Sequence, residues 1–397
     1  SSLASVAQTL FNAFEGHFTL LAIPFFILAS SFMSTGGVAR RIIRFAIACV
    51  GHFPGGLAIA GVLACMMFAA LSGSSPATVV AIGSIVIAGM RQVGYTKDFA
   101  AGVIANAGTL GILIPPSIVM VVYASATDVS VGRMFLAGVI PGLLLVGLFM
   151  AWSLYSTWRW GDASVLSAGS YTGREKFEIL PRVGPFIAII VGVLYAMYGG
   201  IATPSETAAV GALMCLVIAM VIYRLWNPRD LWVVLRDSTK ESVMILFIIG
   251  AAGVFSYMLS SLFITQSIAE WIGTLDVNRW VLMGAINVFL LVAGFFLPPV
   301  AVILMAAPIL LPIITTAGFD PIWFAVVLTI NMEIGLITPP VGLNLYVING
   351  IAPDIPLKTI LIGSLPFVVC MVLAIVILSV FPALATWLPD LLMGPAR

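Results

Sequence analysis

Charged residues are scarce in this chain of 397 residues: only 8% are Asp, Glu, Lys or Arg, whereas 61% are hydrophobic. A typical soluble domain is about 25% charged and about 45–50% apolar. No water-soluble fold could bury this much apolar surface, so the sequence predicts a protein whose solvent is lipid. The 17 basic and 16 acidic residues nearly cancel, and no basic tail suggests a nucleic-acid partner.

Residues that commonly build enzyme or metal sites are also few. The four cysteines lie singly in apolar stretches, so neither a disulfide framework nor a zinc site is indicated. The two histidines, His17 and His52, stand at segment ends without an HExxH or triad context. No nucleophile–base pair or phosphate-binding loop is present, which argues against a membrane enzyme. A signal peptide is also missing after Ser1, and we expect further sequence upstream.

Long hydrophobic runs, by contrast, are abundant, and about 20 apolar residues suffice to span a bilayer. Long runs predict membrane-spanning helices at residues 18–33, 131–155, 183–198, 206–223, 242–262 and 357–387. Gly and Pro interrupt four further runs at residues 55–90, 99–126, 280–316 and 321–350. We interpret the first and third of these as re-entrant helical hairpins, and the second and fourth as helices broken in mid-membrane.

This topology places 14 of the 17 basic residues on one side of the membrane. They are Arg40, Arg41, Arg44, Arg91, Lys97, Arg159, Arg174, Lys176, Arg182, Arg224, Arg229, Arg236, Lys240 and Lys358. Only Arg133, Arg279 and Arg397 fall on the other side. The positive-inside rule makes the first side cytoplasmic. If the hairpins were ordinary spans, the basic loops would scatter over both sides.

The chain divides near its middle. A long polar stretch predicts a cytoplasmic linker at residues 159–182, between a first repeat at 1–158 and a second at 183–397. Each repeat contains an amphipathic stretch, at 38–50 and at 230–241, that is typical of an arm helix lying on the membrane surface. A solvated connecting helix is the alternative for both.

An internal repeat supports this division. GILIPP at residues 111–116 recurs as GLITPP at 335–340, which is 224 residues later. At nearly the same offset, Pro76 in the first hairpin tip matches Pro298-Pro299 in the second. Because the topology puts the two hairpins on opposite sides, the repeats are inverted, which is an architecture of secondary transporters.

Oxygen-bearing residues gather at the interruptions. The first repeat offers the side chains of Ser72, Ser74, Ser75, Thr78, Asn106 and Thr109, and the second offers those of Asn331, Glu333, Thr338 and Asn344. Neutral oxygens and freed carbonyls suit a small hard cation such as sodium, and helix N-termini at the breaks favour an anionic substrate. The alternative is that Gly, Ser and Pro merely permit close helix packing.

Glu333 is the one acidic residue predicted well inside a membrane segment. A charge at that depth costs about 2.5–3.5 kcal/mol on insertion scales, so an acidic residue there is often functional. It could be a cation ligand, a proton carrier, or a buried structural group.

Five motifs occur in order along the chain: AIPFFILAS, SGSSPATVVAIG, NAGTLGILIPPSI, ATPSETAAVGA and NMEIGLITPPVGLNLYV. At these motifs the chain resembles the large membrane subunit of the tripartite ATP-independent periplasmic (TRAP) transporters. The resemblance implies an all-α polytopic protein of the bacterial inner membrane, with an elevator-type transport domain moving against a scaffold. It also implies a small membrane subunit and a periplasmic substrate-binding protein as partners. The implied function is import of an organic acid, commonly a C4-dicarboxylate or sialic acid, coupled to two or more sodium ions.

By this resemblance, the two polar clusters would hold sodium, with the substrate between the hairpin tips. The implied sodium-binding residues are Ser72, Gly73, Ser74, Ser75, Asn106, Gly108, Thr109, Gly111, Leu297, Pro298, Glu333, Gly335, Thr338, Gly342 and Asn344. The implied substrate-binding residues are Ser75, Pro76, Thr78, Pro115, Pro116, Pro299, Pro339 and Pro340. A stand-alone carboxylate carrier of the same superfamily, driven by protons or other ions, is the main alternative. A purely structural assembly subunit is disfavoured by the paired breaks.

Overall fold

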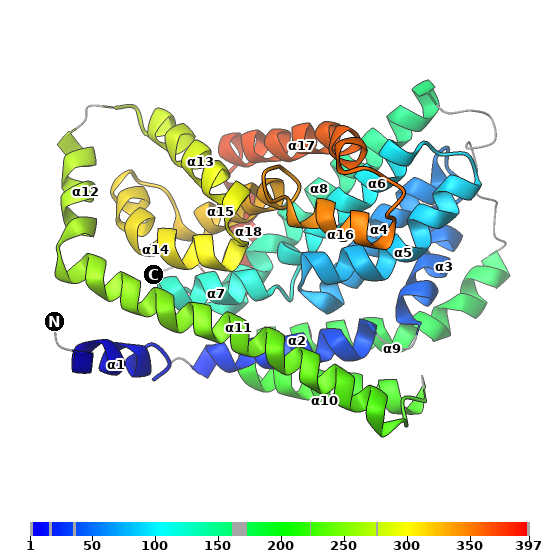
Figure 1. The fold of residues 1–397 in the computed structure, drawn as a ribbon, viewed down its shortest axis with the longest axis horizontal. Helices are drawn as coiled ribbons and strands as arrows, with labels where there is room; N and C mark the ends of the chain where they lie inside the picture. The colour runs from blue at the N-terminus through cyan, green and yellow to red at the C-terminus, as the bar shows by residue number, and fades with distance from the viewer. Residues whose placement is uncertain are drawn as a thin grey trace.

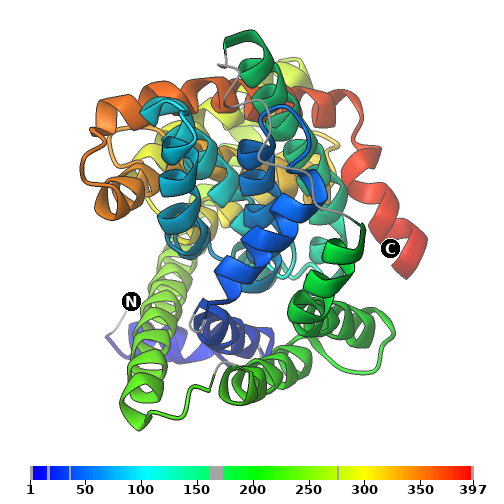
Figure 2. The same cartoon turned by 90° about the vertical axis from the view of Figure 1, so that its right-hand side faces the viewer.

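The computed structural model describes residues 3–15, 18–34, 37–160, 173–222, 224–274 and 277–394, and all regular structure among them is helical. His17, Arg397 and residues 161–172 of the predicted linker lie outside this described part. The helices form a flat layer and a larger body, as Figure 1 and Figure 2 show from two directions.

The flat layer contains helices from both halves of the chain. Its members are α1 (Leu3–Asn12), α2 (Ala22–Ser34), α9 (Gly173–Tyr198), α10 (Pro204–Val221) and α11 (Pro228–Ser261). A short 3-10 helix, η1 (Phe18–Leu21), leads into α2. Within the layer, α2 packs against both α10 and α11, while α9 packs against α10. The layer therefore joins the two repeats.

The larger body also takes helices from both repeats. From the first come α4 (Gly56–Ser72), α5 (Ser75–Gln92), α6 (Lys97–Ala107), η2 (Gly108–Ile112), α7 (Ile118–Thr127) and α8 (Val131–Trp160). From the second come α13 (Arg279–Phe296), α14 (Pro299–Thr316), α15 (Pro321–Leu336), α16 (Leu343–Ile351), α17 (Leu357–Val380) and α18 (Ala383–Met393). The second helix of each hairpin begins at the offset of the internal repeat: α5 begins at Ser75, and α14 begins at Pro299, 224 residues later.

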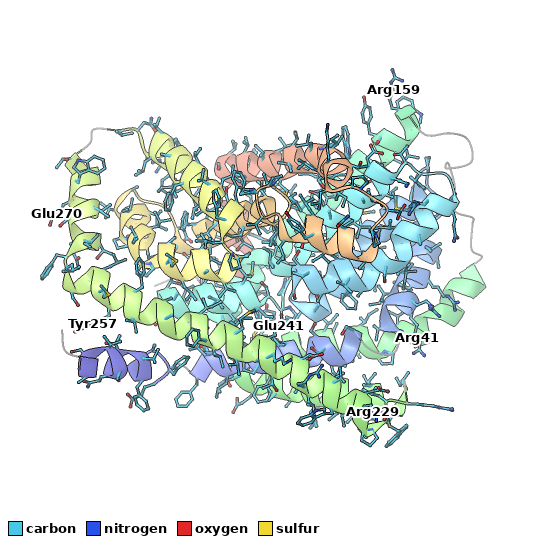
Figure 3. The ribbon with its side chains drawn as sticks, viewed as in Figure 1. Arg41, Arg159, Arg229, Glu241, Tyr257 and Glu270 are labelled. Atoms are coloured by element: carbon cyan, nitrogen blue, oxygen red, sulfur yellow. The ribbon has the colours of Figure 1, made fainter. Side chains whose placement is uncertain are left out.

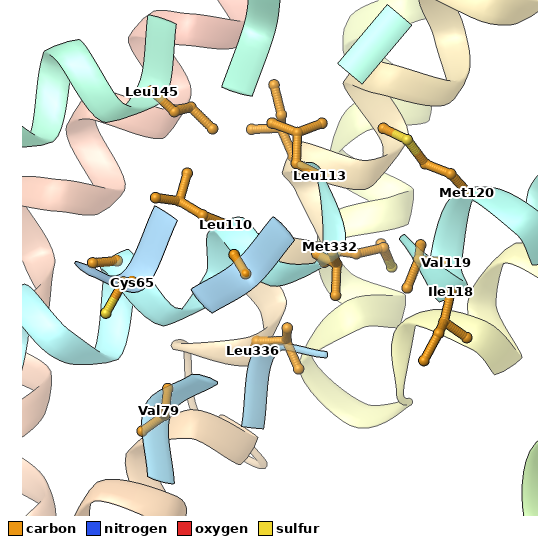
Figure 4. Packing of buried hydrophobic residues seen from close by; sticks show 14 of the residues in the cluster. Cys65, Val79, Leu110, Leu113, Ile118, Val119, Met120, Leu145, Met332 and Leu336 are labelled. Atoms are coloured by element: carbon orange, nitrogen blue, oxygen red, sulfur yellow. The ribbon is translucent and has the colours of Figure 1, made fainter. Parts of the chain in front are cut away.

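The apolar core of the body surrounds the first break. Figure 4 shows Leu110 and Leu113 of that break in one cluster with Leu145 of α8 and Met332 of α15. Leu110, Leu113 and Leu145 are fully buried, and Met332 is 1% exposed. Because lipid tails are as apolar as these side chains, close van der Waals packing rather than transfer from water holds the segment of the first break against both repeats.

Two helices connect the layer to the body: α3 (Val38–Val50) and α12 (Ile264–Thr274). The first has the limits of the amphipathic stretch at 38–50, whereas the stretch at 230–241 does not form a helix of its own. Residues 230–241 form part of α11, which continues without a break into the span that follows. No Pro or Gly interrupts α11 between Pro228 and Gly250, so nothing stops the helix. Helix α12 begins at Ile264, 226 residues after Val38, and connects the layer to the body as α3 does.

The first predicted hairpin is a pair of antiparallel helices. Leu57 at the start of α4 lies beside Gly89 near the end of α5, and Gly61 lies beside Val86. Gly73 and Ser74 join the two helices, and Gly73 has a φ of 58°, which a glycine adopts without strain. In the second repeat, α13 and α14 are joined by Leu297 and Pro298 and splay further apart (Figure 1).

Both predicted broken helices have a break. In the first repeat α6 ends at Ala107, and η2 and an extended segment lead to α7, whose N-terminus is capped by Ser117. In the second, α15 ends at Leu336 and α16 begins at Leu343. The Pro115-Pro116 and Pro339-Pro340 pairs lie in these breaks, and both peptide bonds are cis.

Three other boundaries differ from the sequence predictions. The C-terminal span predicted at 357–387 stops at Val380, and a separate helix, α18, follows Pro382. A proline donates no backbone hydrogen bond, which explains the interruption. Residues 173–182 of the predicted polar linker belong to α9, and α1 was not predicted. Arg133 of α8 forms an ion pair with Asp390, which attaches α18 to the body.

Helices α8, α10, α11, α13, α14 and α17 are long and apolar enough to cross a membrane. A seventh span is possible if η1–α2 and α3, which are bent by 74°, are taken together. Figure 3 shows Arg41, Arg159 and Arg229 towards one end of the long axis and Glu270 and Tyr257 towards the other. Figure 1 shows α4 and α5 reaching the first end, whereas α13 and α14 reach the second.

Candidate functional site

The tip of the first hairpin meets the second repeat through one asparagine. The Nδ2 of Asn344, on α16, donates to the Ser75 Oγ at 2.8 Å and to the Ala105 carbonyl oxygen at 3.0 Å. Both Asn344 and Ser75 are fully buried. The structure therefore brings together three predicted elements: the first hairpin tip, the first broken helix and the second.

Hydroxyl groups brace the first tip from inside. The oxygens of Ser72 and Thr78 lie 2.8 Å apart, and the Thr78 hydroxyl donates to the Ser74 carbonyl oxygen at 2.9 Å. Thr78 is fully buried and Ser72 is 1% exposed. Both side chains therefore stabilise the conformation of the tip. Pro76 lies in the first turn of α5, so the N-terminus of this helix, with its positive dipole end, lies at the tip.

Close backbone contacts hold this tip against the first break. A Cβ on Gly111 would lie 2.7 Å from the Ser74 carbonyl oxygen, and one on Gly73 would lie 2.8 Å from the Pro116 carbonyl oxygen. A Cβ on Gly108 would meet a methyl group of Val79 at 2.2 Å. These positions require glycine because a side chain would push the tip away from the break.

The second tip has an analogous contact but is more open. A Cβ on Gly335 would lie 2.6 Å from the Gly294 carbonyl oxygen, and the Val341 amide donates to the Phe295 carbonyl oxygen at 3.1 Å. Thr338 uses its hydroxyl to bond the Ile334 carbonyl within its own helix turn. The exposed residues here include Leu297, Pro298, Pro339 and Pro340, whereas Pro299 is buried, as are Pro115 and Pro116 in the first repeat. Leu297 and Pro298 therefore do not join the buried cluster.

Glu333 lies at the centre of the body, on α15. Its side chain is fully buried, and neither carboxyl oxygen has a hydrogen-bond partner among the described residues. The Thr109 side chain of η2 is its polar neighbour, so the carboxyl faces the break of the other repeat. Thr109 in turn donates to the Asn106 carbonyl oxygen at 2.7 Å.

Two amide oxygens share this lack of donors. The Oδ1 atoms of Asn106 and Asn344 are buried without a hydrogen-bond partner in the described part of the chain, although the Nδ2 of each residue is bonded. A buried acceptor left unpaired costs about 1–3 kcal/mol. Oxygens that lack donors are suited to a hard cation, so Asn106, Asn344 and Glu333 are candidate ligands.

The sequence did not single out Asn287. This residue lies on α13, and its Oδ1 accepts a hydrogen bond from Asn331 of α15. Its Nδ2 donates to the Met283 carbonyl oxygen at 2.7 Å. The sequence did carry one signal for Asn287, which is that it is a single amide side chain within a hydrophobic run. Asn331, a candidate from the sequence, is thus occupied by a helix–helix contact.

Comparison with known proteins assigns the fold to a family. Residues 2–384 match the model of the tripartite ATP-independent periplasmic transporter, DctM component. The chain belongs to this family. It is therefore a TRAP transporter large permease and a multi-pass inner-membrane protein, not an enzyme, as the sequence motifs predicted.

Curated relatives agree along almost the whole chain. The C4-dicarboxylate TRAP transporter large permease protein DctM of Vibrio cholerae is 51% identical, with 100% of this chain and 91% of the relative covered. The protein of the same name from Pseudomonas aeruginosa is 48% identical, covering 98% of this chain and 90% of the relative. The sialic acid TRAP transporter large permease protein SiaM of Vibrio cholerae is 33% identical, covering 95% and 88%.

A solved structure shares the fold at low identity. The YdaH transporter of Alcanivorax borkumensis superposes with a TM-score of 0.67 at 16% identity, covering 96% of this chain and 88% of that one.

Proposed function

We propose that this permease imports an organic acid together with sodium ions. The observation that carries the proposal is the set of buried, unpaired oxygens of Asn106, Asn344 and Glu333, which come from both repeats. Glu333 supplies the negative charge and the amides supply neutral oxygens. Each of these oxygens lacks a donor, and a cation is a partner that such oxygens can accept.

The sodium ions would be held at the two breaks. In the first repeat the ligands are drawn from Ser72, Gly73, Ser74, Ser75, Asn106, Gly108, Thr109 and Gly111. In the second they are drawn from Glu333, Gly335, Thr338, Gly342 and Asn344, with Leu297 and Pro298 at the tip. Asn344 supports a shared arrangement because it contacts the first tip from the second repeat.

The substrate would lie between the hairpin tips, near Ser75, Pro76, Thr78, Pro299 and the two cis Pro-Pro pairs. Helix N-termini at Ser75 and Pro299 favour a carboxylate there. The relatives of 51% and 48% identity are named for C4-dicarboxylates, and the relative named for sialic acid is more distant. A C4-dicarboxylate is therefore the first substrate to test.

Transport would follow an elevator mechanism. The flat layer of α1, α2, α9, α10 and α11 would be the scaffold, and the larger body would be the moving part. Helices α3 and α12 would act as arms, and both hairpins would be re-entrant. The opposite directions of the hairpins in Figure 1 support this proposal.

Uptake into proteoliposomes tests the proposal. The permease, a small membrane subunit and a periplasmic substrate-binding protein would be combined with labelled C4-dicarboxylate. Each sodium ion entering gains about 2.3 kcal/mol per 100 mV of membrane potential, so accumulation should require an inward sodium gradient. Omission of either partner should abolish uptake. Equal uptake with potassium in place of sodium would overturn the coupling.

A proton-driven, stand-alone carrier is the second candidate, and the buried carboxyl of Glu333 is the observation that favours it. This candidate predicts uptake without sodium, without a binding protein, and with an inward proton gradient. The same proteoliposomes distinguish the two mechanisms when each gradient is imposed alone.

A further inference from the structure

A hydrogen bond between two hydroxyl groups joins the flat layer to the larger body. The Oγ1 of Thr19, in η1 of the layer, lies 3.2 Å from the Oγ of Ser125, in α7 of the body. Both side chains are half-buried, and neither hydroxyl has a second hydrogen-bond partner among the described residues. The two residues are 106 positions apart in the sequence, so the packing of the layer on the body brings them together.

The Ser125 hydroxyl is directed across the interface and not along its own helix. A serine or threonine inside a helix often bonds the carbonyl oxygen one turn earlier. Thr127, two residues further along α7, does this: its hydroxyl donates to the Tyr123 carbonyl oxygen at 2.8 Å. Helix α7 therefore carries one hydroxyl that bonds within the body and one that bonds the layer.

Each end of the bond is attached to its own unit. On the layer, η1 packs against α2 and α10. On the body, the hydroxyl of Tyr123 donates to the Pro321 carbonyl oxygen at 2.9 Å, which connects α7 to α15. Two hydroxyl oxygens more than about 3.5 Å apart are no longer hydrogen-bonded. A slide of the body along the layer therefore breaks the bond between Thr19 and Ser125.

Few other contacts hold the two units together beside this bond. A cavity of about 160 Å³ lies there, and Ser125 is part of its wall. The layer contributes Leu20 and short side chains of α11 to the lining, and the body contributes α7 and α14. Atoms that line a cavity lack van der Waals partners on one side. The hydrogen bond is therefore a substantial part of the local attachment.

We propose that the hydrogen bond between Thr19 and Ser125 is a latch, which holds the body in the position of this structure and opens in each transport cycle. The inference rests on the proposed elevator movement. Hydrogen bonds between membrane helices shift an equilibrium by about threefold on average. A latch of this strength favours one position of the body without preventing its movement.

A disulfide in place of the hydrogen bond tests whether the two units must separate. The variant Thr19→Cys/Ser125→Cys would be made in a chain whose native cysteines are replaced by Ala. These are Cys49, Cys65, Cys215 and Cys370. Oxidation should reduce uptake of labelled C4-dicarboxylate into complete proteoliposomes to background, and reduction should restore it. Thr19→Cys alone, oxidised in the same way, should keep its uptake.

A distance measurement tests the latch without transport. Spin-labelled unnatural amino acids would replace Val217 of α10 and Val380 of α17, which are exposed on the layer and on the body. In lipid nanodiscs, the oxidised cysteine pair defines the latched distance. Thr19→Val and Ser125→Ala should each lower the ratio of latched to unlatched protein about threefold, and the double variant should lower it no further.

Two substitutions are the controls for this measurement. Thr19→Ser keeps the hydroxyl, and Thr127→Ala removes the hydroxyl that bonds within α7. Both should leave the distance distribution unchanged. A shift of equal size in Thr127→Ala would overturn the latch, because any lost hydroxyl on α7 would then have the same effect.

The latch and the elevator movement can fail separately. Undiminished uptake by the fully cross-linked protein would overturn the movement of the body along this part of the layer. An inactive cross-linked protein, together with unchanged distances in Thr19→Val and Ser125→Ala, would overturn the latch alone. Additive effects of these two substitutions would also overturn it, because two hydroxyls that share one bond cannot act independently.

Discussion

Asn344 donates a hydrogen bond to Ser75 across 269 residues of sequence, with 2.8 Å between Nδ2 and Oγ. This bond connects the second repeat to the tip of the first hairpin. The free Oδ1 of Asn344 is left buried and without a donor among the described residues. The amide nitrogen of Asn344 therefore holds the tip, while its oxygen is left for the cation that we propose.

Replacement of Asn344 by Ala should weaken both sodium binding and the fold. Loss of one partner in a buried hydrogen bond typically costs about 1–3 kcal/mol, so the variant should unfold at a lower temperature. The apparent sodium affinity should fall as well, because the variant lacks the proposed Oδ1 ligand. Sodium titration followed by thermal unfolding measures both effects. Asn349→Ala is the control because Asn349 lies on the same helix and bonds the Ile355 carbonyl instead. Equal sodium affinities in the two variants would contradict the assignment.

Replacement of Glu333 by Gln should separate stability from transport. The amide preserves the shape of the side chain but removes its charge, and an uncompensated buried charge is costly. The sodium-free protein should therefore unfold at the same temperature or higher, while sodium-dependent uptake is lost. Glu270→Gln, on the exposed face of α12, should change neither. Retained sodium-driven uptake in Glu333→Gln would remove Glu333 from the cation site.

Local signals were sufficient for the breaks. Gly and Pro interrupt backbone hydrogen bonding at the positions where they occur, so the predicted interruptions contain the tip at Gly73-Ser74 and the Pro115-Pro116 break. The amphipathic pattern at 38–50 likewise reproduced the limits of α3. These features depend on residues close in sequence.

Features that depend on tertiary contacts were not predictable in the same way. The sequence changes from charged to hydrophobic near residue 241, but α11 does not end there, because charged residues are compatible with a continuing helix. The pairing of Asn344 with Ser75, and the absence of donors at Asn106 Oδ1, depend on how distant segments pack. The repeat offset could have indicated α12 as the counterpart of α3, because it begins at Ile264, 226 residues after Val38.

Alanine at the two break glycines that contact the hairpins, Gly111 and Gly335, should disable both hairpins in the same way. The Cβ of Gly111→Ala would press on the Ser74 carbonyl, and that of Gly335→Ala on the Gly294 carbonyl. Overpacking of this kind costs about 1–3 kcal/mol. We expect both variants to lower the unfolding temperature and to lose uptake. Gly284→Ala is the control, since a Cβ at Gly284 meets no atom within 4 Å. Normal uptake by Gly111→Ala would show that the tip tolerates displacement.

Asp354 lies in the loop after α16 and forms ion pairs with the end of α5, in the first hairpin, and with the start of α6. Its Oδ2 lies 2.9 Å from Lys97 Nζ and 2.8 Å from an Arg91 guanidinium nitrogen. Hydrogen bonds from Lys97 and then Arg91 lower the pKa of Asp354 from its ordinary value of 3.8. The stabilisation is therefore fully present above pH 3.8 and is lost as the pH falls through the lowered pKa.

Asp354→Asn should accordingly lower the unfolding temperature slightly at pH 7, because the groups are exposed and such pairs contribute little. The difference from the unsubstituted protein should shrink in about 1 M salt, where the Debye length is about 3 Å, and should vanish under acid conditions that protonate Asp354. Asp128→Asn removes an exposed carboxylate that has no ion pair among the described residues, so it should have no such salt dependence. A salt-independent effect of Asp354→Asn would mean that its role is the packing of the loop, because screening weakens an ion pair but leaves packing intact.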